Sequence, residues 1–233
     1  MAAGTDKVTA IVPAAGCGKR MGRRIPKQFL TLRGKPIFVH TLEKLESSRL
    51  MGTIILVVSA DEVENARLTI AEWGIRKVTR VVSGGKERQD SVWNGLESIP
   101  ADAKIVVVHD AVRPFVSVGK IDKVVRAAQK EGAAVLAVRA KDTVKRGQDG
   151  WVEETLNRDE VWLVQTPQAF RADWIKEAYA EARRDGTVST DDAALVERMG
   201  YRIRIVEGEE RNIKITSPED FRLACVFAEE EGE

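Results

Sequence analysis

The sequence contains little cysteine, and neither sign of charge is in excess. Its 233 residues include only 2 cysteines, Cys17 and Cys225, which are too few and too far apart for a disulfide framework or a zinc site. The 37 Lys and Arg residues nearly balance the 36 Asp and Glu residues, so the net charge is +1. This balance argues against a domain that binds nucleic acid through bulk charge, because such domains are usually strongly basic.

Long apolar runs and a targeting segment are also lacking. Uncharged stretches such as residues 8–18 are well short of the roughly 20 residues that a membrane helix needs. The first seven residues lack the apolar core of a signal peptide. A hydrophobic fraction of 43% with a charged fraction of 31% is typical of a soluble globular chain and not of a disordered one. We therefore expect a cytoplasmic protein that binds neither membranes nor nucleic acid.

Short β-branched runs alternate with segments of helical periodicity. The apolar runs are continuous, as expected for parallel strands covered on both faces, and they lie at 8–12, 53–58, 78–82, 105–108 and 133–138. Helices are expected after Pro36, Asp61 and Ser117, with stops at Gly74 and Gly132, and again at 172–184, 191–199 and 218–229. Short strands are expected at 201–206 and 212–215. This order predicts an α/β fold, a Rossmann-like open and mostly parallel sheet flanked by helices, in a single domain over residues 1–233.

The alternation breaks over residues 139–164. Two extended segments, 143–146 and 151–156, flank the sequence Gly147-Gln148-Asp149-Gly150, which is typical of a hairpin turn. Because the hairpin interrupts the α/β layers, we expect it to project from the domain as an arm.

A glycine-rich loop, residues 13–22, follows the first predicted strand. Ligands of open parallel sheets bind beyond the carboxyl ends of the strands, and glycines there let backbone N–H groups approach phosphate oxygens. The loop does not match the Walker pattern, because Pro13 stands at the position of its first glycine. It does not match the dinucleotide fingerprint either, because Met21 stands at the position of its last glycine. We therefore expect a third kind of phosphate loop.

Positive charge is concentrated beside this loop. Residues 7–42 contain no Asp or Glu, yet they include Lys19, Arg20, Arg23, Arg24, Lys27, Arg33 and Lys35. A solvated basic loop is the simple alternative, but an acid-free basic run beside a glycine turn favours a phosphate site. A nucleic-acid footprint is less favoured, because Phe29 is the one aromatic residue of the 19–35 run.

Asp110 follows the fourth predicted strand, directly after His109. A carboxylate at this end of a strand points into the ligand crevice, where it can hold Mg²⁺ together with substrate phosphates. The alternative is a loop aspartate that caps the following turn. For His109 a structural role is expected.

Further motifs lie at residues 14–21, 26–28, 84–92, 109–114, 142–145, 165–168, 190–192, 212–216 and 218–220. In this order and around this arm, they resemble the 2-C-methyl-D-erythritol 4-phosphate cytidylyltransferase family of the non-mevalonate isoprenoid pathway, over nearly the whole chain. The first loop is shared by many sugar nucleotidyltransferases and indicates only the superfamily. The later motifs are more specific. Lys86 is a departure, because family members often carry Asp there, beside the base pocket.

The resemblance implies transfer of CMP from CTP to 2-C-methyl-D-erythritol 4-phosphate, giving 4-diphosphocytidyl-2-C-methyl-D-erythritol and pyrophosphate by in-line attack of the substrate phosphate on the α-phosphorus. It implies catalytic roles for Arg20, Lys27 and Lys214, and nucleotide contacts from Ala14, Ala15, Gly16, Gly18, Gly85, Ser91 and Asp110. It implies substrate contacts from Arg113, Thr143, Arg158, Thr166 and Thr190, and a Mg²⁺ or other divalent ion on Asp110.

The resemblance also implies a homodimer in which the arm, residues 139–164, reaches across to the other subunit. Thr143 and Arg158 would then serve the site of the partner subunit. Such contact would give the hairpin a surface to pack on, since an isolated two-stranded hairpin is marginally stable in water.

Two other functions remain open from the sequence. A cytidylyltransferase for another polyol phosphate, such as ribitol 5-phosphate, would share the nucleotide half and differ at Arg158, Thr166 and Thr190. A non-catalytic regulatory module that binds nucleotide should have lost Arg20, Lys27 or Asp110, and all three are present.

Overall fold

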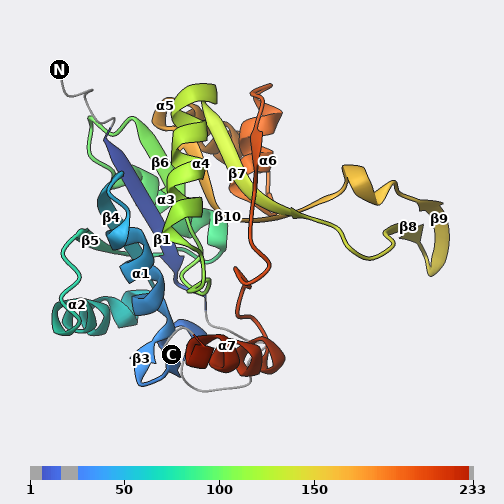
Figure 1. Ribbon diagram of the computed structural model, residues 1–233. Coiled ribbons are helices and arrows are strands. Elements are labelled where there is room, and N and C mark those ends of the chain that lie inside the picture. Colours follow the sequence, from blue (N-terminus) through green and yellow to red (C-terminus); the bar gives the residue numbers. More distant parts are fainter. Residues whose placement is uncertain (1–6, 17–25, 231–233) are drawn as a thin grey trace.

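The computed structural model describes residues 7–16 and 26–230, which form a central sheet with helices on both faces and a long arm (Figure 1). The main sheet of this part of the chain has seven strands in the order β11-β7-β10-β6-β1-β4-β5. Its strands are β1 (Val8–Ala14), β4 (Met51–Val58), β5 (Val78–Ser83), β6 (Ile105–Val108), β7 (Ala133–Arg139), β10 (Trp162–Arg171) and β11 (Arg204–Glu207). All neighbouring pairs are parallel except those of β10, which runs antiparallel to β6 and β7. The predicted fold class, an open and mostly parallel sheet with flanking helices, is confirmed.

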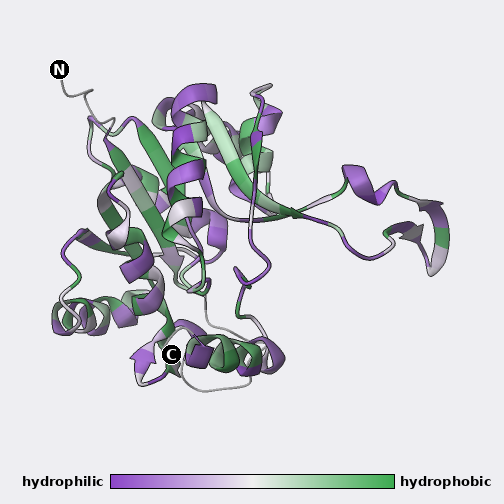
Figure 2. Cartoon of the chain, in the orientation of Figure 1, coloured by the Kyte–Doolittle hydropathy of each residue, from purple (hydrophilic) through white to green (hydrophobic). Residues whose placement is uncertain are grey.

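Seven α-helices surround the sheet in the described residues. They are α1 (Ile37–Ser47), α2 (Val63–Glu72), α3 (Arg88–Glu97), α4 (Val118–Glu131), α5 (Ala172–Asp185), α6 (Asp192–Arg198) and α7 (Pro218–Glu230). Side chains of β1 alternate between two cores: Ala10 and Val12 pack with α1, α2 and α4, whereas Ile11 packs with α3, α5 and α6. The strands are therefore covered on both faces, which explains their continuous apolar sequences (Figure 2).

A third, smaller core lies beneath the carboxyl ends of the strands. There α7 packs through Ala224 and Ala228 against Leu32 and Ile37, close to a two-stranded ribbon of β2 (Thr31–Leu32) and β3 (Lys35–Pro36). Ile215 belongs to the same core, and its N–H donates to the carbonyl of Val112 over 2.9 Å. This packing ties the C-terminal segment to the loop that follows β6.

Local signals explain several helix ends. Helix α4 is capped at its N-terminus by Ser117, whose Oγ accepts a hydrogen bond from the N–H of Lys120, and at its C-terminus by Gly132, where φ is 94°. Asp61 does not cap α2, because it lies within a 3-10 turn, Ala60–Glu62, that precedes that helix. Pro36 ends β3 and immediately precedes α1 instead of lying in its first turn.

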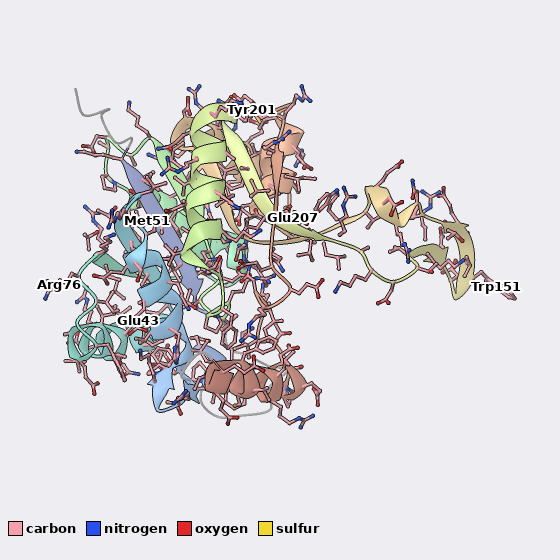
Figure 3. The ribbon with its side chains drawn as sticks, in the orientation of Figure 1. Glu43, Met51, Arg76, Trp151, Tyr201 and Glu207 are labelled. Carbon is pink, nitrogen blue, oxygen red and sulfur yellow. The ribbon has the colours of Figure 1, made fainter. Side chains whose placement is uncertain are left out.

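The arm consists of β8 (Lys145–Gln148) and β9 (Trp151–Thr155), an antiparallel pair whose residues are all exposed. It extends far from the sheet, and Trp151 lies at its tip with 80% of its surface exposed (Figure 3). The prediction of a hairpin here is correct. Within residues 7–16 and 26–230, none of the helices combines the length and the apolar character that crossing a bilayer requires.

One prediction at the strand level was wrong, because residues 212–215 do not form a strand. The strand expected at 201–206 is present as β11 but begins later, at Arg204. The sequence pattern also missed β10 and α3.

Candidate functional site

Two adjacent cavities open at the carboxyl ends of the parallel strands. The smaller has a volume of about 190 Å³ and is lined by the end of β1, by Lys27 and by the loop that precedes α3. The larger, about 530 Å³, is lined by residues of β10, by Thr190, by Ile205 of β11 and by Ile203 just before that strand. Both cavities are lined by Arg88, Asp110 and Lys214. We call these three residues the shared wall.

The smaller cavity is shaped by two loops whose backbones lie very close together, the first loop at Ala15 and the loop at Gly84 and Gly85. The N–H of Gly84 donates to the carbonyl of Val58 over 2.7 Å, so the loop continues directly from the end of the sheet. A Cβ on Gly84 would lie 2.4 Å from the Cβ of Ala15 and 2.7 Å from Oγ of Ser91, so a larger residue would displace the first loop. The N–H of Gly85 donates to Oγ of Ser91 over 3.2 Å. Only glycine therefore leaves room for the two loops to lie side by side.

Lys27 reaches the same cavity from a 3-10 turn, Lys27–Phe29. The buried amide of Gln28 fixes this turn, because its Nε2 donates to the carbonyl of Ala14. The turn thus brings a basic side chain to the cavity that Ala15 and Gly16 also line.

The carboxylate of Asp110 is the anionic centre of the shared wall. Its Oδ1 accepts a hydrogen bond from Nε of Arg88 at 3.2 Å, and its Oδ2 lies 2.8 Å from Nζ of Lys214 and 3.5 Å from Nε of Arg113. Burial alone would raise the pKa of Asp110, but the charges of Arg88, Lys214 and Arg113 hold that pKa well below its ordinary value. Asp110 therefore stays ionised beside three cations, of which Arg88 and Lys214 line both cavities and Arg113 lines the larger one.

Arg88 is held from behind by a second buried carboxylate. Nη1 and Nη2 of Arg88 donate to Oδ1 and Oδ2 of Asp192 at 3.0 and 2.7 Å, and Oη of Tyr179 donates to Oδ1 as well. Burial opposes the charged form of Arg88, but Asp192 and Asp110 outweigh it and raise the pKa of the guanidinium. Sequence reasoning assigned no role to Arg88 or Asp192, although both lie in motifs on which the resemblance rests.

His109 is fully buried and uses both ring nitrogens. Nε2 lies 3.2 Å from the carbonyl of Arg113, so this nitrogen carries the proton, and Nδ1 accepts from Oγ1 of Thr166 at 3.0 Å. The same Oγ1 accepts a hydrogen bond from the N–H of Asp110 at 3.0 Å. Burial lowers the pKa of His109 to about 4, which keeps the ring neutral. The structural role expected for His109 agrees with this geometry.

Comparison with known proteins identifies the family. The family model for IspD, 2-C-methyl-D-erythritol 4-phosphate cytidylyltransferase, matches residues 8–230. A protein of that name from Pelotomaculum thermopropionicum is 52% identical over 221 residues, 94% of this chain and 93% of its own length. One from Geobacillus kaustophilus is 47% identical over 92% of this chain and 94% of its own. The chain belongs to the 2-C-methyl-D-erythritol 4-phosphate cytidylyltransferase family. The resemblance seen in the motifs is thereby confirmed.

Solved structures of the family share the fold. A 4-diphosphocytidyl-2C-methyl-D-erythritol synthase from Anaerococcus prevotii superposes with a TM-score of 0.86 at 31% identity, over 97% of both chains. A 2-C-methyl-D-erythritol 4-phosphate cytidylyltransferase from Thermus thermophilus superposes with a TM-score of 0.77 at 34% identity, over 96% of this chain and 99% of that one. The mostly parallel sheet with flanking helices is therefore the fold of this family.

The residues expected to act in this cytidylyltransferase fold divide between the cavities. The smaller cavity is lined by the catalytic candidate Lys27 and by candidates for nucleotide binding, namely Ala14, Ala15, Gly16, Gly85, Ser91 and Asp110. Lys86 also lines it. The larger cavity is lined by the candidates for the alcohol phosphate, namely Arg113, Thr166 and Thr190. Gly18 and Arg20 lie outside the described residues.

Thr143 and Arg158 line neither cavity of their own chain. Both are exposed in the arm region, where Nη1 of Arg158 donates to the carbonyl of Lys141 over 3.1 Å. Their position outside the site is the one expected if they act on another subunit, and the predicted dimer contact stays a prediction.

A divalent cation fits the shared wall as a companion of substrate phosphates. Among the described residues, no three His, Cys, Asp or Glu side chains are grouped so that they could hold a metal. Asp110 supplies one carboxylate, whose oxygens already contact Arg88 and Lys214. One carboxylate together with phosphate oxygens is a donor set that Mg²⁺ commonly uses. The residues present therefore suit an ion that enters with a triphosphate.

Proposed function

We propose that this protein transfers CMP from CTP to 2-C-methyl-D-erythritol 4-phosphate, releasing pyrophosphate. Membership of the family, at 47–52% identity over nearly the full length, supports this activity. The observation that carries the mechanism is the shared wall. Arg88, Asp110 and Lys214 line both the smaller cavity, which we assign to the nucleotide, and the larger cavity, which we assign to the alcohol phosphate. Two anionic substrates bound on either side would meet at this wall.

CTP would occupy the smaller cavity. The backbone of Ala14–Gly16, together with Gly85 and Ser91, would contact the cytosine and ribose. Lys27 would bind the triphosphate, as would Arg20 from the glycine-rich loop. Glycine at position 84 supports this assignment, because it lets the two loops approach closely enough to hold a flat base.

The alcohol phosphate would occupy the larger cavity, next to Arg113, Thr166 and Thr190. Arg113 is already fixed, because its Nη1 donates to the carbonyl of Asn212 over 2.6 Å. We propose a homodimer in which Thr143 and Arg158 of each arm complete the site of the other subunit. The exposed apolar tip of the arm at Trp151 and Val152 supports such a contact.

The reaction needs charge stabilisation more than a general base. A phosphate oxygen of the acceptor, anionic at pH 7, forms a bond to the α-phosphorus of CTP. The bond from that phosphorus to the β-phosphate oxygen breaks, and pyrophosphate leaves with its electron pair. Lys214 and Lys27 would neutralise the charge that builds on the α-phosphate and the leaving group. His109 is unsuited to act as a base, because both of its nitrogens are engaged and its pKa is lowered to about 4 by burial.

Asp110 would hold a Mg²⁺ ion that enters with the nucleotide. When bound, the ion supplies further positive charge to the phosphates. The chain's own part is to keep Asp110 ionised, which Arg88, Lys214 and Arg113 accomplish. Because CTP is supplied in the cytoplasm, we propose that the protein acts there.

Pyrophosphate release tests this function. Purified protein with CTP and Mg²⁺ should release pyrophosphate rapidly with 2-C-methyl-D-erythritol 4-phosphate and at least about 100-fold more slowly with ribitol 5-phosphate, because the groups of the larger cavity are arranged for one acceptor. Faster release with ribitol 5-phosphate would assign the protein to the other polyol phosphate. Binding of CTP without turnover of either acceptor would indicate a regulatory module.

A further inference from the structure

The carboxylate of Asp192 is the most deeply buried charge near the site, and it touches neither cavity. Its side chain has no exposed surface, and its three hydrogen-bond donors are the two Nη groups of Arg88 and the hydroxyl of Tyr179. Tyr179 is itself buried, so its hydroxyl depends on this contact. Burial, followed by the charge of Asp192, raises the pKa of Tyr179 well above its ordinary value, so the hydroxyl remains a donor.

Asp192 is not needed to start its helix. The first turn of α6 is capped by Asp191, whose Oδ1 accepts from the N–H of Ala194 at 3.0 Å. The N–H of Ala193 is taken by the side chain of Gln168, also at 3.0 Å. The carboxylate of Asp192 is therefore devoted to Arg88 and Tyr179.

The bidentate contact between Arg88 and Asp192, which we call the fork, determines which nitrogen of Arg88 faces Asp110. A guanidinium prefers a bidentate contact with a carboxylate, and two buried carboxylates, Asp192 and Asp110, are within reach of Arg88. Because Asp192 accepts one N–H from each Nη group, Arg88 presents its Nε to Oδ1 of Asp110, at 3.2 Å. Oδ2 of Asp110 is thereby left for Lys214 at 2.8 Å. Without Asp192, Arg88 would be free to turn its fork onto Asp110 and compete with Lys214.

We propose that Asp192, supported by Tyr179, is a positioning residue. It holds Arg88 with Nε toward Oδ1 of Asp110, which leaves Oδ2 to keep Lys214 in place between the two substrates. This inference rests on the proposed function, in which Lys214 stabilises the reacting phosphate. It assigns to the buried pair a role in catalysis beyond stability. A buried ion pair contributes little net stability compared with apolar residues of the same volume, because removing both charges from water is costly.

The first test is the Asp192→Asn variant, which keeps the size of the side chain and removes its charge. We expect kcat to fall about 100-fold, the cost typical of a catalytic group displaced by about 1 Å. The KM for CTP should change by less than about threefold, since the base and ribose contacts lie elsewhere. Tyr179→Phe keeps the fork and removes one donor, so its kcat should fall by a smaller factor, roughly 5-fold.

A matched control is available in the same chain. Arg171 and Asp173 form a similar two-point contact, with Nε of Arg171 at 3.0 Å from Oδ1 of Asp173, but both side chains are at least half exposed and line neither of the two cavities. Asp173→Asn should leave kcat and KM unchanged within about twofold, because exposed ion pairs contribute little.

A double-mutant cycle with Arg88→Lys distinguishes positioning from general support of the fold. Lysine cannot form a fork, so in the Arg88→Lys background the further change Asp192→Asn should lower kcat by less than about threefold. Independent losses that multiply would overturn the proposal, as would an Asp192→Asn variant with normal kcat. If Asp192→Asn does not fold, as judged by circular dichroism, the cycle of Tyr179→Phe with Arg88→Lys decides in the same way. A wild-type protein that forms no product refutes the proposed function. An active wild type in which the two losses of kcat multiply refutes the positioning role alone.

Discussion

Lowering the pH from 7 to 5 should destabilise this protein, and His109 should be the main cause. The ring is fully buried, and burial lowers its pKa to about 4, whereas an unfolded chain binds that proton with a pKa of 6.5. Between these two values the unfolded state binds the proton and the folded state does not. The free energy of unfolding therefore falls as the pH drops below about 6.5, and the loss levels off near pH 4.

The magnitude follows from the two pKa values. Each pH unit between them costs about 1.4 kcal/mol, so the step from pH 7 to pH 5 should lower the free energy of unfolding by about 2 kcal/mol. Asp110 does not contribute in this range. Its pKa is lowered, so the stability that it supplies is present above its unfolded pKa near 3.8 and is lost only below that value.

Urea unfolding of the wild type and of His109→Gln, at pH 7 and pH 5 and one protein concentration, measures this effect. Glutamine can donate to the carbonyl of Arg113 and accept from Thr166, as the neutral ring does, but it does not titrate. The wild type should lose about 2 kcal/mol more than the variant between the two pH values. Equal losses in both proteins would show that His109 does not titrate between these pKa values and would refute the reasoning.

Three further predictions concern the cavities and the arm. Lys27→Ala should lower kcat by about 10² to 10³ and change the KM for CTP far less, and a steady-state assay that found near-normal kcat would reject a catalytic role for this lysine. Gly84→Ala should raise the KM for CTP roughly tenfold, because the added Cβ would lie 2.4 Å from that of Ala15 and displace the first loop; an unchanged KM would mean that the loops do not hold the nucleotide. An equal mixture of the inactive variants Lys27→Ala and Arg158→Ala should regain roughly a quarter of wild-type activity after subunit exchange, because half of the dimers would then contain one intact site. A mixture no more active than its components would argue against sharing of the arm.

The strands of the parallel sheet could be predicted from sequence because their burial on both faces makes them continuously apolar. Strand β10 could not, because its central residues, Gln165 to Gln168, are polar and include Pro167. These polar side chains can be buried because they have hydrogen-bond partners. Thr166 bonds to His109, for example, and Nε2 of Gln165 donates to the carbonyl of Glu209 over 2.8 Å. The polar residues of β10 that line the larger cavity thus made this strand unrecognisable from its sequence pattern.

The opposite error occurred at residues 212–215. Ile213 and Ile215 suggested a strand, but the segment is fixed by side chains, since Nδ2 of Asn212 donates to the carbonyl of Thr166 at 2.9 Å. Strand propensity without a neighbouring strand to pair with does not make a sheet.

Most of the candidate residues that the motifs supplied line one of the two cavities. The arrangement of the shared wall could not be predicted in the same way. Arg88 and Asp192 are 104 residues apart in the sequence and meet only because α3 and α6 pack on the same face of the sheet. Neither residue is distinctive alone, and their importance depends on burial that local sequence does not encode.

In the proposed reaction, the acceptor phosphate attacks the α-phosphorus of CTP across the shared wall. The most direct test of this attack is ³¹P NMR of the product made from 2-C-methyl-D-erythritol 4-phosphate labelled with ¹⁸O in its phosphate. We predict that the product contains one labelled bridging oxygen, which shifts both of its diphosphate resonances, and that the released pyrophosphate carries no label. Label in the pyrophosphate, or a product that keeps its terminal phosphate monoester, would contradict the account.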